Sequence, residues 1–219
     1  MNIESIIAEL KSHANPKNVQ GMARFGINPE NTLGVSIPII RALAKRIGKD
    51  HKLALQLWDT KIHEARLLAG FIDDPSKATE RQLESWVKQF NSWDICDQVC
   101  SSLFDKTRWA YAQAIEWSSA KEEYVKRAGF VLMACLAVHD KKAADGKFLA
   151  FLPVIKREST DERNFVKKAV NWALRQIGKR NRALNGAAIK CAEQIRKIDS
   201  KSAKWIAADA LRELKKSTF

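Results

Sequence analysis

Apolar residues recur at helical spacing along almost the whole of this 219-residue chain, and no other feature restricts its fold as strongly. The chain contains only nine glycines and five prolines. Signals for β-hairpins are missing, because the one Asn-Gly pair, Asn185-Gly186, lies inside a helical pattern. The sequence therefore predicts an all-α protein.

Breaks in the pattern at "HANP", "GINPENTLG", "DDPS" and "SSAKEE" divide it into segments. Pro38 suits a helix start, where its missing N–H costs little, and Thr79 suits an N-cap. The segments that we expect to be helical lie near residues 2–13, 37–49, 51–59, 62–72, 79–89, 93–104, 107–117, 122–138, 144–155, 161–178, 183–197 and 200–216.

Copies of one helix recur along the chain. "EARLLAGFI" (64–72) and "EYVKRAGFV" (123–131) share Ala-Gly-Phe, and "YVKRAGFVL" (124–132) aligns with "FVKKAVNWA" (165–173). The second pair is separated by 41 residues, which is typical of solenoids built from two-helix repeats. We expect residues 1–219 to form one domain, an α-solenoid of antiparallel helix pairs with a concave face. A plain helical bundle is the alternative.

The formal charge of +13 is distributed unevenly. Residues 1–120 hold 15 Lys or Arg against 14 Asp or Glu, residues 121–182 hold 15 against 7, and residues 183–219 hold 8 against 4. Such asymmetry favours a face that binds a polyanion, above all nucleic acid. A basic surface kept for solubility, or a groove for acidic peptides, would give the same count, and charge does not separate DNA from RNA.

Four cysteines, Cys96, Cys100, Cys135 and Cys191, are too scattered to indicate a disulfide framework. We expect reduced, half-buried thiols. A zinc site that includes His139 is the alternative, although no CxxC pair supports it, and we expect neither a metal nor a cofactor. No apolar run of about 18 residues predicts a membrane span, and the start lacks a signal-peptide pattern, so we expect a cytoplasmic protein.

The helix expected at 161–178 has two distinct sides. The side opposite its apolar stripe carries Lys168, Trp172, Arg175 and Lys179. A tryptophan among three cations suggests an aromatic platform flanked by phosphate-binding groups; alternatively, Trp172 packs under a neighbouring helix. The stripe itself consists of Val166, Ala169, Val170, Ala173, Leu174 and Ile177.

A basic position recurs in the helix expected at 122–138. Arg127 lies off the apolar stripe of that helix and aligns with Lys168 in the next copy. Recurring cations along a solenoid would suit the regular spacing of a phosphate backbone, whereas an ordinary solvated face is the alternative.

The helix expected at 93–104 carries Trp93, Asp97 and Ser101 on a face beside its apolar stripe. Asp94 suits the helix N-terminus, where a carboxylate is stabilised by roughly 0.3–1 kcal/mol. Asp97 lies one turn further, where capping explains it less well. From periodicity alone, Asp97 is equally well explained as a salt-bridge partner and as a functional group.

Several segments together resemble the AlkD-type DNA alkylation repair glycosylases, which consist of HEAT-like helical repeats. The resemblance covers most of the chain, and the order and spacing of the last three motifs make it specific. The similar segments are "NPKNVQGMARFGIN" (15–28), "LGVSIPIIRALAK" (33–45), "SWDICDQVC" (92–100), "YVKRAGFVL" (124–132) and "FVKKAVNWALRQIGK" (165–179).

The resemblance implies particular residue roles on a concave basic face. A carboxylate and two tryptophans beside the sugar of the damaged nucleotide fall on Asp97, Trp93 and Trp172. The DNA contacts of the family fall on Arg127 and Arg175, and we expect Lys168 and Lys179 to join them. The N-terminal aromatic is usually Tyr in that family and is Phe25 in this chain, so any contact of its hydroxyl is absent.

The resemblance also implies an activity. We expect a monofunctional glycosylase that hydrolyses the N-glycosidic bond of cationic N3- or N7-alkylated purines in duplex DNA, without base flipping or strand cleavage. The expected partner is duplex DNA with such lesions, bound by a monomer that acts on the nucleoid of a bacterial-type cell. The rival interpretations are a non-catalytic HEAT-repeat DNA-binding protein and a protein-interaction solenoid.

Overall fold

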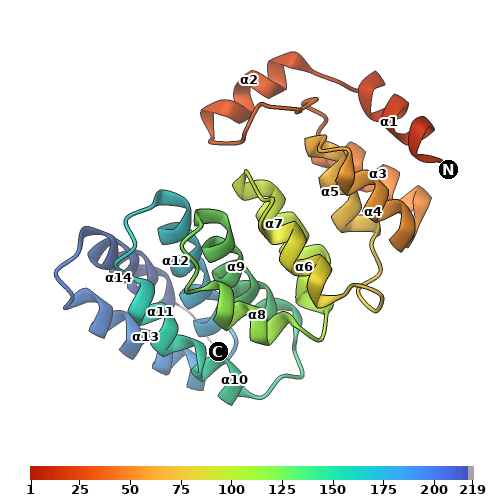
Figure 1. Ribbon diagram of the computed structural model, residues 1–219. Coiled ribbons are helices and arrows are strands. Elements are labelled where there is room, and N and C mark those ends of the chain that lie inside the picture. The colour runs from red at the N-terminus through yellow and green to blue at the C-terminus, as the bar shows by residue number, and fades with distance from the viewer. Residues whose placement is uncertain (217–219) are drawn as a thin grey trace. The chain divides into compact units, whose positions relative to one another are not determined.

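The computed structural model describes residues 1–216, and every regular element in that part of the chain is a helix. The prediction of an all-α fold is confirmed (Figure 1). The chain divides into two compact units, Met1–Thr107 and Arg108–Phe219, and the single-domain organisation stays a prediction. Within residues 1–216, no helix is both long enough and apolar enough to cross a membrane.

The first unit contains α1 to α7 and a short 3-10 helix, η1. Thr79 caps α6 as expected, because its side chain accepts a hydrogen bond from the Gln82 N–H. The bounds are Ile3–Ser12 (α1), Pro16–Arg24 (α2), Ile37–Ile47 (α3), His51–Asp59 (α4), His63–Ile72 (α5), Glu80–Val87 (α6), Trp93–Ser102 (α7) and Phe104–Lys106 (η1).

The second unit contains α8 to α14. The bounds are Ala110–Trp117 (α8), Glu123–His139 (α9), Asp145–Leu149 (α10), Phe151–Glu158 (α11), Asn164–Gly178 (α12), Arg182–Arg196 (α13) and Lys201–Leu214 (α14).

Two elements differ from the sequence-based expectation. Helix α2 was not predicted; it buries none of its residues completely, and its apolar side is short, with Val19 and Met22 half-buried. It begins with Asn15 as N-cap and Pro16 in the first turn. The single helix expected at 144–155 is two helices that separate at Ala150. Pro153 lacks the N–H that would bond to the Leu149 carbonyl, which explains the break just before it.

A buried carboxylate fixes the loop between α2 and α3 in the first unit. Glu64 of α5 is completely buried, and its two oxygens accept hydrogen bonds from the N–H groups of Leu33, Gly34 and Val35 at 2.6–3.2 Å. Gly34 has φ +80°, and a Cβ there would collide with the Asn15 carbonyl oxygen. The loop is therefore held closely against α2 and α5.

Helix α9 forms the centre of the second unit and is buried almost all round, from Arg127 to Ala137. Gly129 permits this packing, because a Cβ there would lie 2.5 Å from the Ser118 backbone nitrogen at the end of α8. Gly70 of α5 is similarly close to Val99 of α7, with 3.0 Å to Cγ2. The shared Ala-Gly-Phe motif thus marks helices that approach a neighbour closely.

The two units differ in the sequence separation of residues that meet on neighbouring helices. In the first unit, Trp58 donates to Gln89, and His63 is bonded to Asp94, each pair 31 residues apart. In the second unit a separation of 38 residues recurs, in the contacts that join Ser119 to Arg157, Arg127 to Phe165, Lys156 to Gln194, Asn171 to Asp209 and Arg175 to Glu213. This register is about one helical turn shorter than the 41-residue spacing of the aligned copies.

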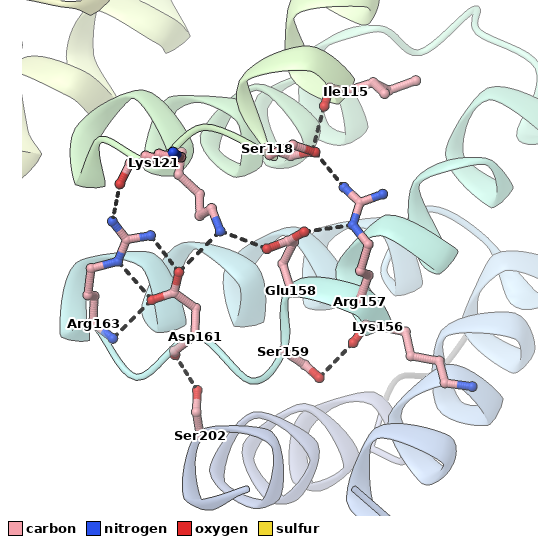
Figure 2. A network of polar contacts seen from close by, with 12 residues as sticks. Ile115, Ser118, Lys121, Lys156, Arg157, Glu158, Ser159, Asp161, Arg163 and Ser202 are labelled. Carbon is pink, nitrogen blue, oxygen red and sulfur yellow. Dashed lines mark hydrogen bonds and ion pairs between the residues drawn. The ribbon is translucent and has the colours of Figure 1, made fainter.

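Figure 2 shows a polar network that joins α9 to the loop between α11 and α12. The Lys126 ammonium lies 2.7 Å from a Glu158 carboxylate oxygen and 3.3 Å from one of Asp161. Arg157 also binds Glu158, at 2.6 Å, and Arg163 binds Asp161, at 2.6 Å. Burial raises the pKa of both carboxyls, but hydrogen bonds and charges of these cations outweigh it, so that each pKa lies below its ordinary value.

This network predicts acid sensitivity of the second unit. A carboxyl group with a lowered folded-state pKa stabilises the fold above its unfolded-state pKa and loses that contribution as the pH falls through the folded-state value. We expect the free energy of unfolding to fall as the pH drops below about 4.5. Lys126→Met should flatten this dependence in urea titrations at several pH values; an unaltered pH slope would contradict the assignment.

The helical glycines of the second unit predict opposite effects of one substitution. Gly129→Ala should lower the free energy of unfolding by about 1–3 kcal/mol, because the new methyl group collides with the Ser118 backbone. Gly186→Ala, in α13, meets nothing within 4 Å and should raise that free energy by about 0.5–1 kcal/mol. Urea unfolding of both variants tests the pair, and equal effects would contradict the packing argument.

Candidate nucleic-acid interface

Helix α7 places Trp93 and Asp97 one turn apart on a half-buried edge, as the sequence predicts. The core side of the same helix is formed by Ile95, Cys96 and Val99, which are at most 1% exposed. Because residues four apart lie on the same side of a helix, the indole of Trp93 and the Asp97 carboxylate share one surface. The phasing of this helix is confirmed.

Backbone contacts from the α2–α3 loop fix the start of α7. The Trp93 indole N–H donates to the Phe25 carbonyl oxygen at 3.0 Å, and the Asn28 N–H donates to the Ser92 hydroxyl at 2.9 Å. The Phe25 ring itself is 74% exposed. Phe25 thus orients Trp93 through its backbone carbonyl. This contact does not depend on the tyrosine hydroxyl that Phe25 lacks. The sequence contains no signal for such a contact, since it involves only a backbone carbonyl.

Asp94 lies in the first turn of α7, as expected, but its side chain serves another purpose than capping. Its Oδ2 lies 2.8 Å from the His63 Nε2 at the start of α5, and both residues are buried. The N-cap of α7 is Ser92. Asp94 therefore joins two helix starts beneath the Trp93 surface.

A pocket of about 620 Å³ opens beside Trp93 within the first unit. Its wall is largely apolar, with Met22 and Phe25 from α2 and its C-cap, Ile37 from α3 and Leu67 from α5. Asp94 and Gln98 of α7 add polar groups on one side. Gln98 also accepts a hydrogen bond from Arg41 at 3.1 Å. The sequence did not indicate this pocket, because most of its wall comes from the unpredicted α2 and the loop after it.

Helix α12 in the second unit has the two sides that its sequence predicts. All six residues of the expected apolar stripe are at most 1% exposed. Lys168 is exposed and Trp172 is half-buried. Lys168 and Trp172 therefore lie on the accessible side of α12, as the sequence predicts.

The other two predicted cations of α12 lie against carboxylates of α14. Arg175 and Lys179 both form ion pairs with Glu213, and Arg175 also lies 3.7 Å from Asp209. Burial raises the pKa of Glu213, but hydrogen bonds from Lys179 and Arg175 outweigh it, so the net pKa is lowered. A phosphate group would have to compete with Glu213 for both cations.

Arg127 does not lie on an open face, so the expectation of a solvated cation there is wrong. It is 6% exposed, and one of its guanidinium N–H groups donates to the Phe165 carbonyl oxygen at 2.5 Å. The phasing failed because α9 packs against both α8 and α12 and has no wide solvent side. A DNA-binding role of Arg127 stays a prediction.

The cysteines are buried rather than half-buried, and all four are thiols rather than disulfides. Burial raises the pKa of Cys191 to about 11. Among residues 1–216, no group of three or more His, Cys, Asp or Glu side chains is arranged to hold a metal ion.

Comparison with known proteins defines the class to which this helical-repeat fold belongs. A solved structure from a family related to the HEAT-like repeat DNA glycosylases, and described as having affinity for branched DNA structures, aligns with a TM-score of 0.80. It shares 20% sequence identity and covers 98% of this chain and 96% of its own. The predicted HEAT-like repeat fold is thereby confirmed. No curated protein sequence matches the chain significantly.

The sequence itself establishes the family. The profile of the DNA alkylation repair enzyme family matches residues 6–214, nearly the whole chain. The protein belongs to the DNA alkylation repair enzyme family, as the motifs indicated.

The pairing of Glu213 predicts a higher DNA affinity when this carboxylate is removed. Glu213→Gln should release Arg175 and Lys179 for binding to phosphates and raise duplex affinity several-fold. The slope of log K against log[salt] should become steeper by roughly 0.9 for each additional phosphate that the protein neutralises. Fluorescence anisotropy at several salt concentrations measures both quantities. A shallower slope would mean instead that Glu213 orients these cations for DNA.

Proposed function

We propose that the protein is a monofunctional DNA glycosylase that hydrolyses the N-glycosidic bond of cationic N3- or N7-alkylated purines in duplex DNA. The observation that carries the proposal is the Trp93–Asp97 pair on one accessible edge of α7, in a chain that belongs to the DNA alkylation repair enzymes. The family supplies the type of damage, and the pair supplies groups suited to its chemistry.

The chemistry requires little acid catalysis, because a positively charged purine is already a good leaving group. As the C1′–N bond breaks, the deoxyribose develops positive charge. The Asp97 carboxylate would stabilise that charge and orient a water molecule, whose oxygen bonds to C1′ while its proton passes to the carboxylate or to solvent. The products are a free neutral base and an abasic site, and no amine nucleophile is involved.

Trp93 would hold the sugar and attract the cationic centre. A cation over an indole face is stabilised by roughly 0.5–2 kcal/mol, depending on exposure to solvent. The hydrogen bond from its indole N–H to the Phe25 carbonyl oxygen holds the ring in one orientation before DNA binds. A preoriented ring loses little conformational entropy on binding.

The second unit would supply most of the affinity for the DNA backbone. Lys168 and Trp172 present an exposed cation and a half-buried indole on α12, and Arg175 and Lys179 lie further along the same helix and at its C-cap. Contacts of this kind position a protein on DNA without reading its sequence. The family resemblance also assigns Trp172 to the damaged sugar and Arg127 to DNA, and both assignments are part of the proposal.

A second candidate is a DNA-binding protein without catalytic activity. It is favoured by the aligned relative, which is described by its affinity for branched DNA structures. Presence of both tryptophans and of Asp97 favours the enzyme instead. The two candidates differ in one measurable product, the free alkylated base.

Substitution of the carboxylate tests the enzyme directly. Asp97→Asn should lower release of 7-methylguanine from methylated duplex DNA by at least about 100-fold, as for loss of one general acid–base group. Its affinity for the same duplex should change little. Release is followed by chromatography of the free base.

A matched control makes the result specific. Asp59→Asn removes an exposed carboxylate at the end of α4 and should leave base release unchanged. Full release by Asp97→Asn would remove Asp97 from the mechanism. Tight duplex binding without release by the wild type would establish the non-catalytic candidate.

A further inference from the structure

The seam between α12 and α14 contains three side-chain pairs at the constant separation of 38 residues. Asn171 binds Asp209 at 2.7 Å, and Arg175 binds Glu213. The pair nearest the N-terminal ends of both helices is different, since the Lys167 ammonium lies over the Trp205 ring, 5.2 Å from its centroid. The first two pairs are contacts between polar groups, whereas the third leaves an aromatic ring on the surface.

The core does not require a tryptophan at position 205. The buried side of α14 consists of small and aliphatic residues, including Ala203, Ile206, Ala207 and Ala210, each completely buried. Trp205 is 41% exposed, whereas the core tryptophans Trp58, Trp86 and Trp117 are at most 3% exposed.

Positive charge around Trp205 remains available to a ligand. Lys201 lies one turn before Trp205 on α14, is exposed, and forms no ion pair within residues 1–216. Lys167 contacts the indole and likewise has no carboxylate partner in the described part of the chain. Lys204 is paired with Asp199 at 2.7 Å. The other end of the seam, by contrast, is neutralised by Asp209 and Glu213.

We propose that Trp205, together with Lys167 and Lys201, binds an unpaired base of a single-stranded DNA segment that adjoins the duplex. An exposed indole offers a π-face on which any base can stack, and the two ammonium groups suit the phosphates of the same strand. A base within an intact duplex is stacked on both faces and cannot take this position. The site therefore distinguishes DNA with an unpaired strand from blunt duplex.

The cation–π contact between Lys167 and Trp205 orients the indole of the proposed site. The Lys167 ammonium over the ring favours one orientation of the indole, and it places a positive charge next to the aromatic surface. This inference rests on the DNA binding that the proposed function requires, but not on Asp97 or on base release.

The test compares a blunt duplex with the same duplex carrying a single-stranded tail, by fluorescence anisotropy on the full chain. The wild type should bind the tailed duplex more tightly, and Trp205→Ala should lower affinity for it by about 10-fold, the range found for loss of one stacked base. Affinity for the blunt duplex should change less than about two-fold. Trp205→Tyr should retain most of the preference for the tail.

Two controls separate this inference from general damage to the fold. Ile115→Ala removes an apolar side chain of α8 that is 46% exposed and should leave the tail preference intact. Lys201→Gln should make the salt slope for the tailed duplex shallower by roughly 0.7, the value for one single-strand phosphate contact.

The outcomes are distinguishable. The inference would be overturned if the wild type bound the tailed and blunt duplexes equally tightly. It would also be overturned if Trp205→Ala kept the full preference of the wild type for the tailed duplex. An equal loss on both DNAs would also overturn it, since Trp205 would then be a duplex contact. Absence of any duplex binding by the wild type would instead refute the proposed function.

Discussion

A 38-residue register recurs between neighbouring helices of the second unit and decides which side chains meet between α12 and α14. It brings the Arg127 guanidinium to the Phe165 carbonyl, and it aligns Asn171 with Asp209 and Arg175 with Glu213. Gly129 lets α9 approach α8 to a distance at which a methyl group would collide with backbone, and the same helix packs against α12. A shift of one helical turn would replace each of these pairs at once, so the surface chemistry depends on the core.

The first unit positions the α7 edge that carries Trp93 and Asp97 in another way. Its helix α2 has no fully buried residue, so apolar packing contributes little to holding it in place. Polar contacts add to it: the buried Glu64 carboxylate holds the adjoining loop, and the Phe25 carbonyl oxygen accepts a hydrogen bond from the Trp93 indole N–H. Hydrogen bonds to a buried carboxylate are directional and strong, which suits a loop that must place a ring accurately.

Features that belong to a single helix could be predicted from the sequence. The apolar stripes of α7 and α12, and the accessible edge with Trp93 and Asp97, could be read from periodicity alone. Contacts that need two helices could not. Arg127 is off its own stripe, yet it is covered because α9 has neighbours on several sides. The carboxylates that neutralise Arg175 and Lys179 lie on α14 and become visible only when the register is known.

The two units of the chain differ in net charge, and this difference bears on the proposed chemistry. Residues 108–219 hold 24 Lys or Arg against 12 Asp or Glu, whereas residues 1–107 hold 14 against 13. A carboxylate that must stabilise a cationic sugar is most effective where few basic residues oppose its potential. Asp97 belongs to the nearly neutral unit, and the proposed phosphate-binding cations belong to the basic one. In the proposed function, the basic residues of the second unit would therefore provide the attraction for a polyanion, and the first unit would provide the carboxylate that acts on a cationic lesion.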